Sequence, residues 1–294
     1  MTHVPVMPAE VLRHLRPAQG GLFVDCTVGL GGHARALLEG GATRIIGLDR
    51  DLDALARARE TLAPWSDRVD LVHADYRAIA DVLDSRHIAT VDGALADLGV
   101  SSLQLDSPGR GFSFQRDEPL DMRMDRNGGA TAADLIAQST ERDLADAIFQ
   151  YGEERFSRRI ARALVAARAE TPVDTTGRLA AIVRRAIPRR RGPMRIDPAT
   201  RTFQALRIWV NHELEGLDRF VEIAARRLRA GARLVVITFH SLEDRVVKHT
   251  LRALQQRDAL VQVLTRKPLI ASDEELQRNP RARSAKLRAA ERMA

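Results

Sequence analysis

Short apolar runs alternate with amphipathic segments over the first hundred residues of the chain. Apolar runs rich in β-branched residues predict strands, and apolar residues spaced three and four apart predict helices. The expected strands are residues 22–24, 44–48, 69–73 and 91–97, and the expected helices between them are 34–38, 52–62 and 76–83. Strands that alternate with helices in this way favour an α/β fold with a parallel sheet covered on both faces.

This alternation stops near Gly99. Residues 99–127 are polar and dotted with glycine, and a loop of this length inside a domain is usually functional or disordered. Phenylalanine and methionine within it argue against disorder. The pattern then becomes helical over residues 131–216. We therefore predict a helical domain inserted into the sheet domain.

The helical region and the chain that follows it predict further elements. Helices are expected at residues 156–167, at 177–187 and from Thr202 to a stop at Gly231. A fifth strand is expected at 233–239, with two final edge strands at 260–264 and near Leu287. The predicted boundaries give a sheet domain over 1–110 and 216–294, with the helical insertion over 111–215.

A glycine-rich turn follows the first predicted strand. Gly29, Gly31 and Gly32 stand between that strand and a helix, and glycine permits a positive φ and a close approach of the backbone to a ligand. The turn opens onto a helix N-terminus with free N–H groups. Asp49 ends the second strand about 20 residues after Gly29, where a carboxylate accepts the hydroxyls of a ribose. An alternative for Asp49 is a helix N-cap. The pattern predicts an adenosine-binding half-fold.

The glycines alone do not distinguish a methyl donor from a dinucleotide, because they also fit the dinucleotide motif. Asp25 precedes the glycines, where it would repel a pyrophosphate but suit the positive methionine end of S-adenosylmethionine. His33 places a bulky ring where a pyrophosphate turn usually keeps small residues. S-adenosylmethionine is therefore the predicted cofactor. A nicotinamide dehydrogenase and a ligand-free tight turn are the alternatives.

Composition narrows the class of protein. Lys and Arg number 46 against 39 Asp and Glu, and this moderate excess favours a polyanionic partner. The clusters at residues 184–195 and 278–283 suit RNA phosphates, the alternative being a solvated arginine face.

Cys26 is the only cysteine, which excludes internal disulfides and cysteine-cluster zinc sites, and we expect no metal. No signal layout or membrane-length apolar run is visible, which predicts a cytoplasmic enzyme.

Several strings of residues together resemble a known family, the bacterial small-subunit ribosomal RNA cytosine-N4 methyltransferases. These strings are His3-Val-Pro-Val, Asp25-Cys-Thr-Val-Gly-Leu-Gly-Gly-His33, Asp97-Leu-Gly-Val-Ser-Ser102, Arg110-Gly-Phe-Ser-Phe114, Leu120-Asp-Met-Arg-Met-Asp125, Tyr151-Gly-Glu-Glu-Arg-Phe156, Ala199-Thr-Arg-Thr-Phe-Gln204, Arg207-Ile-Trp-Val-Asn211, Phe239-His-Ser-Leu-Glu-Asp244 and Asn279-Pro-Arg-Ala-Arg-Ser284. The resemblance spans nearly the whole chain. It implies a Rossmann-like methyltransferase domain with an inserted helical, substrate-recognition domain.

The resemblance also implies ligands and the residues that bind them. The cofactor would be S-adenosylmethionine, and the target a decoding-site cytidine of 16S ribosomal RNA in the small ribosomal subunit, with no DNA or membrane partner. The implied cofactor-binding residues are Gly31, Gly32, His33, Asp49, Tyr76, Asp97 and Gln104. From pattern alone, Gln104 reads as loop surface and Tyr76 equally well as a core aromatic. Leu103 departs from the family, which usually has proline there.

The implied reaction is methyl transfer to an exocyclic amine, whose lone pair is conjugated into the base. Acceptors must hold the amine hydrogens and localise that lone pair, and positioning supplies much of the rate. Amine methyltransferases usually carry an Asp/Asn/Ser-Pro-Pro-aromatic string, which Asp97-Leu-Gly-Val replaces here. The catalytic candidates are Asp97 and His240. Asp97 would orient the amine, hold the cofactor or do both. The alternative for His240 is a hydrogen bond to a loop carbonyl. Further candidates are Ser101, Ser102 and Ser241, with Phe112, Phe114 or Phe239 either stacking a flipped base or packing in the core.

Two other functions compete with this one. A non-catalytic RNA-binding assembly factor would be favoured by an eroded cofactor loop, and this loop is intact. A methyltransferase acting on another nucleic acid would share the mechanism, but a DNA amine methyltransferase should carry the proline-proline string.

Overall fold

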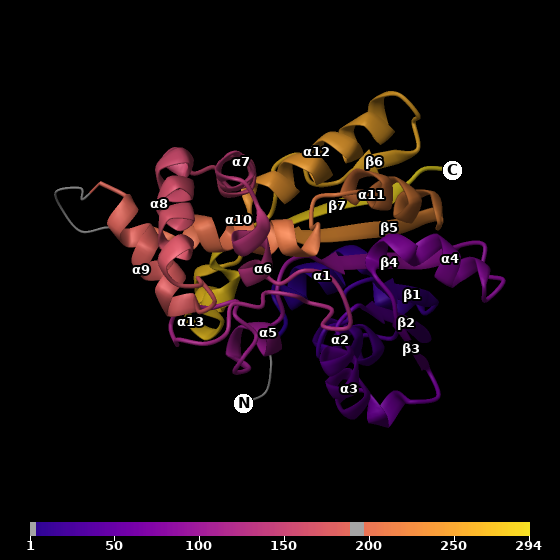
Figure 1. Cartoon of the computed structure of the whole chain (residues 1–294). Coiled ribbons are helices and arrows are strands. Elements are labelled where there is room, and N and C mark those ends of the chain that lie inside the picture. Colours follow the sequence, from indigo (N-terminus) through magenta and orange to yellow (C-terminus); the bar gives the residue numbers. More distant parts are fainter. Residues whose placement is uncertain (1–3, 189–196) are drawn as a thin grey trace. The chain divides into compact units, whose positions relative to one another are not determined.

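The structure is a computed structural model that describes residues 4–188 and 197–294 (Figure 1). It has two compact units, which we call the sheet unit (Met1–Gly99 and Leu214–Ala294) and the insertion unit (Val100–Glu213). The predicted domain boundaries, after residues 110 and 215, differ from these. The first boundary comes earlier because the chain after Gly99 packs within the insertion unit. Leu120 donates its N–H to the Asp174 carbonyl at 2.8 Å and lies in that unit's apolar core.

A seven-stranded sheet with the order β3-β2-β1-β4-β5-β7-β6 forms the centre of the sheet unit. The strands are β1 (Leu22–Asp25), β2 (Arg44–Asp49), β3 (Val69–His73), β4 (Val91–Asp97), β5 (Leu228–Thr238), β6 (Val261–Val263) and β7 (Lys286–Arg292). The first five are parallel, and β7 is antiparallel to both of its neighbours. This mainly parallel, Rossmann-like arrangement confirms the predicted α/β class.

One predicted strand position is wrong. β7 lies between β5 and β6 rather than at the edge of the sheet. Leu287, Ala289 and Ala290 are completely buried, as is typical of a strand covered on both faces. The short β6 forms the edge in its place.

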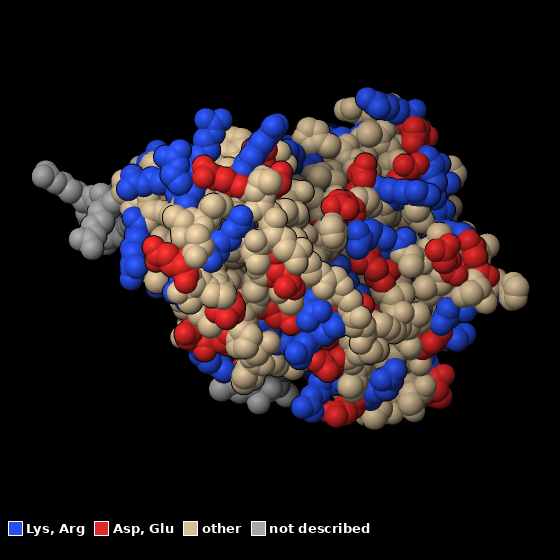
Figure 2. Space-filling view, in the orientation of Figure 1, with Lys and Arg blue, Asp and Glu red and all other residues tan. Residues whose placement is uncertain are grey.

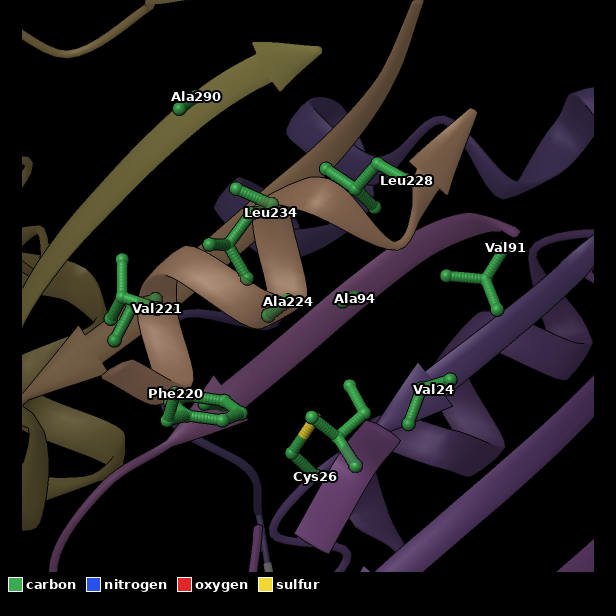
Figure 3. Close-up of a cluster of buried hydrophobic side chains, with 14 of the residues drawn as sticks. Val24, Cys26, Val91, Ala94, Phe220, Val221, Ala224, Leu228, Leu234 and Ala290 are labelled. Atoms are coloured by element: carbon green, nitrogen blue, oxygen red, sulfur yellow. The ribbon is translucent and has the colours of Figure 1, made fainter. Parts of the chain in front are cut away.

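Helices cover both faces of this sheet. They are α1 (Pro8–Leu15), α2 (Gly32–Glu39), α3 (Leu52–Thr61), α4 (Ile79–Asp84), α11 (Leu217–Arg226), α12 (Ser241–Gln256) and α13 (Asp273–Arg278), with short 3₁₀ turns η1 (Pro17–Gln19), η2 (Ala63–Trp65), η3 (Tyr76–Ala78) and η4 (Pro280–Ser284). Successive strand residues alternate between two apolar clusters, so that Phe23 belongs to one and Val24 to the other. Figure 3 shows the second cluster, where Phe220 and Val221 of α11 lie over the strands.

Phe220 is a large anchor of this cluster, with 1% of its surface exposed. We expect Phe220→Ala to lower the free energy of unfolding by about 3–5 kcal/mol, because it removes buried apolar area and leaves a cavity. Phe149→Ala is the matched control, since its ring is 60% exposed and its loss should change stability little. Urea unfolding of both variants measures the difference, and equal effects would contradict the prediction.

The insertion unit is helical. Its helices are α5 (Ser102–Asp106), α6 (Ala132–Gln138), α7 (Glu141–Gly152), α8 (Ser157–Glu170), α9 (Thr176–Ala186) and α10 (Ala199–Asn211). Thr131 and Thr140 each begin a helix with a reciprocal capping box. α8 and α9 correspond to the helices predicted at 156–167 and 177–187.

The long helix predicted from Thr202 to Gly231 is wrong, because two helices and the start of a strand occupy that stretch. α10 ends at Asn211, where His212 has a left-handed φ of 50°. Gly216, with φ of 68°, precedes α11. Apolar residues keep a helical spacing across the break, so the pattern does not reveal it. Within residues 4–188 and 197–294, no helix is long and apolar enough to cross a bilayer.

Candidate active site at the carboxyl ends of β1, β2 and β4

The glycine turn joins β1 to α2 at the carboxyl edge of the sheet. Gly29 and Gly31 have φ values of 52° and 83°, the left-handed region that glycine adopts freely. A Cβ on Gly31 would lie 3.1 Å from the Leu62 side chain, and a Cβ on Gly32 would lie 3.3 Å from Pro5. Backbone conformation at Gly31 and packing at both positions therefore favour glycine, and Gly31, Gly32 and His33 lie at the N-terminus of α2.

Asp49 ties the end of β2 to this turn. One carboxylate oxygen accepts the Gly29 N–H at 2.8 Å, and the other accepts the Asp51 N–H at 2.9 Å. The N-cap of α3 is Asp51, whose side chain accepts the Asp53 N–H, so the capping alternative applies to Asp51 and not to Asp49. Burial raises the pKa of Asp49 to about 6, although the two N–H donors and Arg50 oppose it. A carboxylate has further lone pairs with which to accept ribose hydroxyls.

Asp97 and His33 meet beside the turn. Asp97 ends β4, and its N–H donates to the Thr27 hydroxyl at 2.7 Å. The Nε2 atom of His33 lies 3.3 Å from Oδ2 of Asp97, and the imidazole is only 6% exposed. Burial opposes the imidazolium form, but Asp97, together with the charges of Asp25 and Glu275, raises the pKa of His33 above its usual value. Thr27, which also donates its N–H to Asp25, is a site residue that the sequence pattern does not single out.

Asp25 lies beneath this pair and has no exposed surface. Its Oδ1 atom accepts the Thr27 N–H at 3.2 Å. Burial raises the pKa of Asp25 to about 7, with the charges of Asp97 and Asp49 adding to the shift and His33 opposing it. The expectation that Asp25 faces the positive end of a cofactor is not met, because a fully buried carboxylate acts on a ligand only through its neighbours.

Two buried polar atoms beside the glycine turn have no hydrogen-bond partner in the part of the chain that the structure describes, as is also true of Oδ2 of the fully buried Asp25. Oδ1 of Asp97 and Nδ1 of His33 form no hydrogen bond with any residue of the described ranges. Buried polar groups are normally paired, and unpaired ones next to a close-approach glycine turn are typical of a binding site. An acceptor of this kind fits an ammonium or an amine N–H. The donor and acceptor set therefore fits the cationic amino-acid end of S-adenosylmethionine.

Tyr76 is held from the side of the core. Its ring packs edge-to-face against Phe220 with centroids 4.7 Å apart, and the Arg77 guanidinium lies 5.7 Å from its centroid. Arg77 forms a two-pronged ion pair with Asp75 at 2.7 Å on both prongs. The ring is anchored and partly exposed, so it presents a fixed apolar edge after β3.

His240 caps α12 at the end of β5. Its Nδ1 accepts the Glu243 N–H at 3.3 Å, and a Glu243 oxygen accepts the Phe239 N–H at 2.9 Å. The other imidazole nitrogen lies 3.1 Å from the second Glu243 oxygen. Because Ile237 pairs with Asp97 across β4 and β5, His240 stands at the neighbouring strand end. The structure thus gives His240 a capping role in place of the bond to a loop carbonyl, and its catalytic role stays a prediction.

Several candidates belong to the insertion unit. Gln104 is buried and completes a capping box, in which its Oε1 accepts the Ser101 N–H at 2.9 Å, so it is not loop surface. Phe112 and Phe114 pack in the core of that unit, Phe114 edge-to-face with Phe203. These contacts favour the core alternative for both rings over base stacking.

The remaining candidates lie elsewhere. Phe239, in the sheet unit, packs against the backbone at Gly99. Ser241 is the first residue of α12, and Ser102 is the first of α5.

Residues 4–7 are bonded to residues 275–279 and lie against the glycine turn, a contact that sequence reasoning missed. Glu275 of α13 accepts the Met7 N–H at 2.6 Å across a separation of 268 residues. Asn279 donates to the Val4 carbonyl at 3.3 Å, and the segment between these bonds places Pro5 against Gly32. The sequence motifs that begin at His3 and at Asn279 belong to the family resemblance, but no local pattern pairs them.

The predicted basic clusters are only partly placed. Arg184 forms a forked ion pair with Asp197, and Arg278 pairs with Glu274. Residues 189–196 lie outside the described ranges. Figure 2 shows Lys and Arg side chains gathered over α8, whose Arg158, Arg159 and Arg162 are exposed.

A glycine turn, an acid at the end of β2 and an unpaired carboxylate at the end of β4 define a Rossmann-like protein that binds a nucleoside-type cofactor. The model of the MraW methylase family matches residues 1–293, and the chain belongs to that family. It is 48% identical to a protein of Geotalea uraniireducens and 50% identical to one of Pelobacter propionicus, each comparison covering 99% of this chain and 98% of the relative. A relative from Nitratidesulfovibrio vulgaris is 52% identical over 99% of this chain and 86% of its own length. All three relatives are called ribosomal RNA small subunit methyltransferase H.

Proposed function

We propose that this protein transfers a methyl group from S-adenosylmethionine to the N4 amine of a cytidine in the decoding region of 16S ribosomal RNA. The observation that carries the proposal is the match to the MraW methylase family over residues 1–293. The unpaired carboxylate oxygen of Asp97, beside the glycine turn, adds chemical support. The substrate would be the small ribosomal subunit in the cytoplasm, with no role for DNA or a membrane.

The proposed cofactor-binding residues are those that the family resemblance implies. They are Gly31, Gly32, His33, Asp49, Tyr76, Asp97 and Gln104. S-adenosylmethionine supplies a methyl group activated on a positively charged sulfur. Asp49 would accept ribose hydroxyls while it holds the Gly29 N–H, and Tyr76, whose ring is fixed by Phe220, would flank the adenine. Glycine without a Cβ lets the turn lie against the ligand.

Asp97 is the proposed catalytic residue. Its free oxygen would accept a hydrogen bond from the exocyclic amine, which would localise the nitrogen lone pair toward the methyl group. As the N–C bond forms and the S–C bond of the donor breaks, the nitrogen would release one proton to this carboxylate or to water. The Nε2 atom of His33 lies 3.3 Å from the other oxygen and fixes its position. His240 acts as a positioning residue, since its cap with Glu243 fixes the end of β5 beside Asp97.

The proposal is tested with tritiated S-adenosylmethionine and small subunits from cells that lack the protein. After transfer, the RNA is digested and the labelled nucleoside is identified. Label in N4-methylcytidine is the expected result, and free cytidine is expected to be a poor substrate because it lacks the RNA contacts. Intact cofactor binding without label on subunits or naked 16S RNA would overturn the proposed substrate.

Asp49→Asn tests the proposed ribose acceptor. Asparagine keeps one acceptor oxygen but presents an NH₂ group to the second backbone N–H, so the glycine turn loses a hydrogen bond. We expect a loss of about 1–3 kcal/mol in the free energy of unfolding and at least about tenfold weaker cofactor binding. Calorimetric titration with S-adenosylmethionine gives the affinity. The exposed Asp67→Asn is the matched control, and equal affinities in the two variants would exclude the assigned role.

A further inference from the structure

A polar pocket in the sheet unit is lined by side chains of α12, of β6 and the residues after it, and of β7. Figure 1 shows α12 next to β6. Its volume is about 330 Å³, and we call it the α12 pocket, defined by Lys248, Arg252, Gln255, Gln262, Arg266 and Arg288. The α12 members are spaced four and three residues apart and so share one face of the helix. Gln255 accepts the Val263 N–H at 2.7 Å and ties that face to β6. The pocket is therefore a built feature of the sheet unit.

Most of the positive charge in this pocket is uncompensated. Arg288, 4% exposed, bonds Asp244 with Nε–Oδ1 and Nη2–Oδ2 distances of 2.6 and 3.2 Å. Over the described parts of the chain, no carboxylate lies within ion-pair distance of Lys248, Arg252 or Arg266. Many other arginines of the sheet unit do form ion pairs with a carboxylate. A concave site lined by one sign of charge concentrates the potential. The pocket thus favours an anion.

The lining also indicates which anion. The residues that line the pocket include no aromatic ring on which a base would stack. Guanidinium, ammonium and amide N–H groups are those that contact phosphate and sugar, contacts that position a nucleic acid without reading its bases. Backbone phosphates therefore fit the pocket better than a nucleobase does.

The position of the pocket connects it to the proposed site. α12 begins beside His240, at the strand end next to Asp97. Lys248 and Arg252 follow about 12 to 18 Å further along the helix axis. An RNA strand with one nucleotide at Asp97 would carry phosphates over this distance within a few nucleotides.

We propose that the α12 pocket binds the phosphodiester backbone of the RNA substrate a few nucleotides from the methylated base. This inference rests on the proposed function. It adds a second contact region to the sheet unit, which holds the substrate without selecting its sequence.

The test compares two variants that lose the same charge. K248Q/R252Q/R266Q removes the unpaired cations of the pocket, and R219Q/R257Q/K267Q removes three exposed cations of the sheet unit that do not line it. The affinity of each for a 16S ribosomal RNA transcript and for small subunits is measured against salt concentration. For the pocket variant we expect binding weaker by about tenfold or more and a salt slope reduced by about 2, since each lost phosphate contact removes about 0.7 from the slope on single-stranded RNA. Cofactor affinity should be unchanged.

The outcomes separate the two proposals. If the wild-type protein methylates subunits but both triple variants bind RNA alike, the pocket is overturned and the proposed function stands. If RNA binding depends on the pocket while no methyl transfer occurs, the pocket stands as a site for RNA phosphates, but the proposed function falls and with it the assignment of that RNA as a methylation substrate. A wild-type protein that binds no RNA overturns both. The exposed single variant R266Q should give a smaller shift in the same direction, and it serves if the triple variant unfolds.

Discussion

Asp97→Asn is expected to lower the rate of methyl transfer by about a thousandfold while the protein stays folded. Asparagine has the same size, but it lacks the negative charge that orients the amine and pairs with His33. Loss of one preorganised electrostatic contact or one proton acceptor at a reacting atom typically costs 10²- to 10⁴-fold, roughly. Single-turnover transfer of label to small subunits measures the effect. Transfer within about tenfold of the wild-type rate would show that Asp97 is not the catalytic acceptor.

Cofactor titration of the same variant separates the two roles left open for Asp97. Intact affinity for S-adenosylmethionine with slow transfer assigns Asp97 to the amine of the substrate. Affinity lost in proportion to the rate assigns it to the ammonium group of the cofactor. Asp146→Asn, on an exposed side chain of the insertion unit, is the matched control and should leave both quantities unchanged.

Local chemistry made most of the sheet and the glycine turn predictable. The strands at 69–73 and 91–97 were found with their observed ends, because β-branched and apolar residues stop abruptly at His73 and Asp97. The turn required glycine at Gly29 and Gly31, and the structure gives both a positive φ. Period and turn chemistry are properties of neighbouring residues, so a single sequence contains them.

Features that depend on distant contacts were not predictable in the same way. The place of β7 between β5 and β6 is decided by pairing partners, and the run from Lys286 to Arg292 carries no mark of its neighbours. The bond from Met7 to Glu275 joins opposite ends of the chain. The break after Asn211 lies within an unbroken apolar spacing, so only the backbone at His212 and Gly216 reveals it.

Burial changed the interpretation of one charged residue. In the sequence, Asp25 is a carboxylate that precedes a glycine turn, which predicts that it faces the positive end of S-adenosylmethionine. In the fold it is fully buried, and its Oδ2 atom accepts no hydrogen bond from the described residues. Desolvation then outweighs attraction, and the pKa of Asp25 rises to about 7. A sequence shows that a charge is present but not whether water reaches it.

Asp25→Asn should therefore make the cofactor-free protein more stable above pH 7. The pKa of this carboxyl is ordinarily 3.8 but about 7 in the fold, so between these pH values the folded state holds a proton that the unfolded chain has already lost. Stability consequently falls as the pH rises from about 4 to 7, by about 4 kcal/mol for a shift of about three units. Asparagine cannot ionise and keeps an acceptor for the Thr27 N–H, so the variant lacks this loss.

The charged neighbours of Asp25 set the shape of the expected pH profile. His33, whose pKa is also raised in the fold, contributes stability at low pH that disappears as the pH rises, so it adds to the same slope. Asp49, whose pKa is raised to about 6, adds to the same loss of stability with rising pH. The contributions of His33 and Asp49 remain in the Asp25→Asn variant in reduced form. Urea unfolding of the two proteins from pH 4 to 8, with the exposed Asp67→Asn as control, should give curves that coincide near pH 4 and separate by several kcal/mol at pH 8. Parallel curves of stability against pH would mean that Asp25 is ionised in the fold at neutral pH. Its carboxylate would then be a permanent negative charge that holds the imidazolium of His33 beside Asp97.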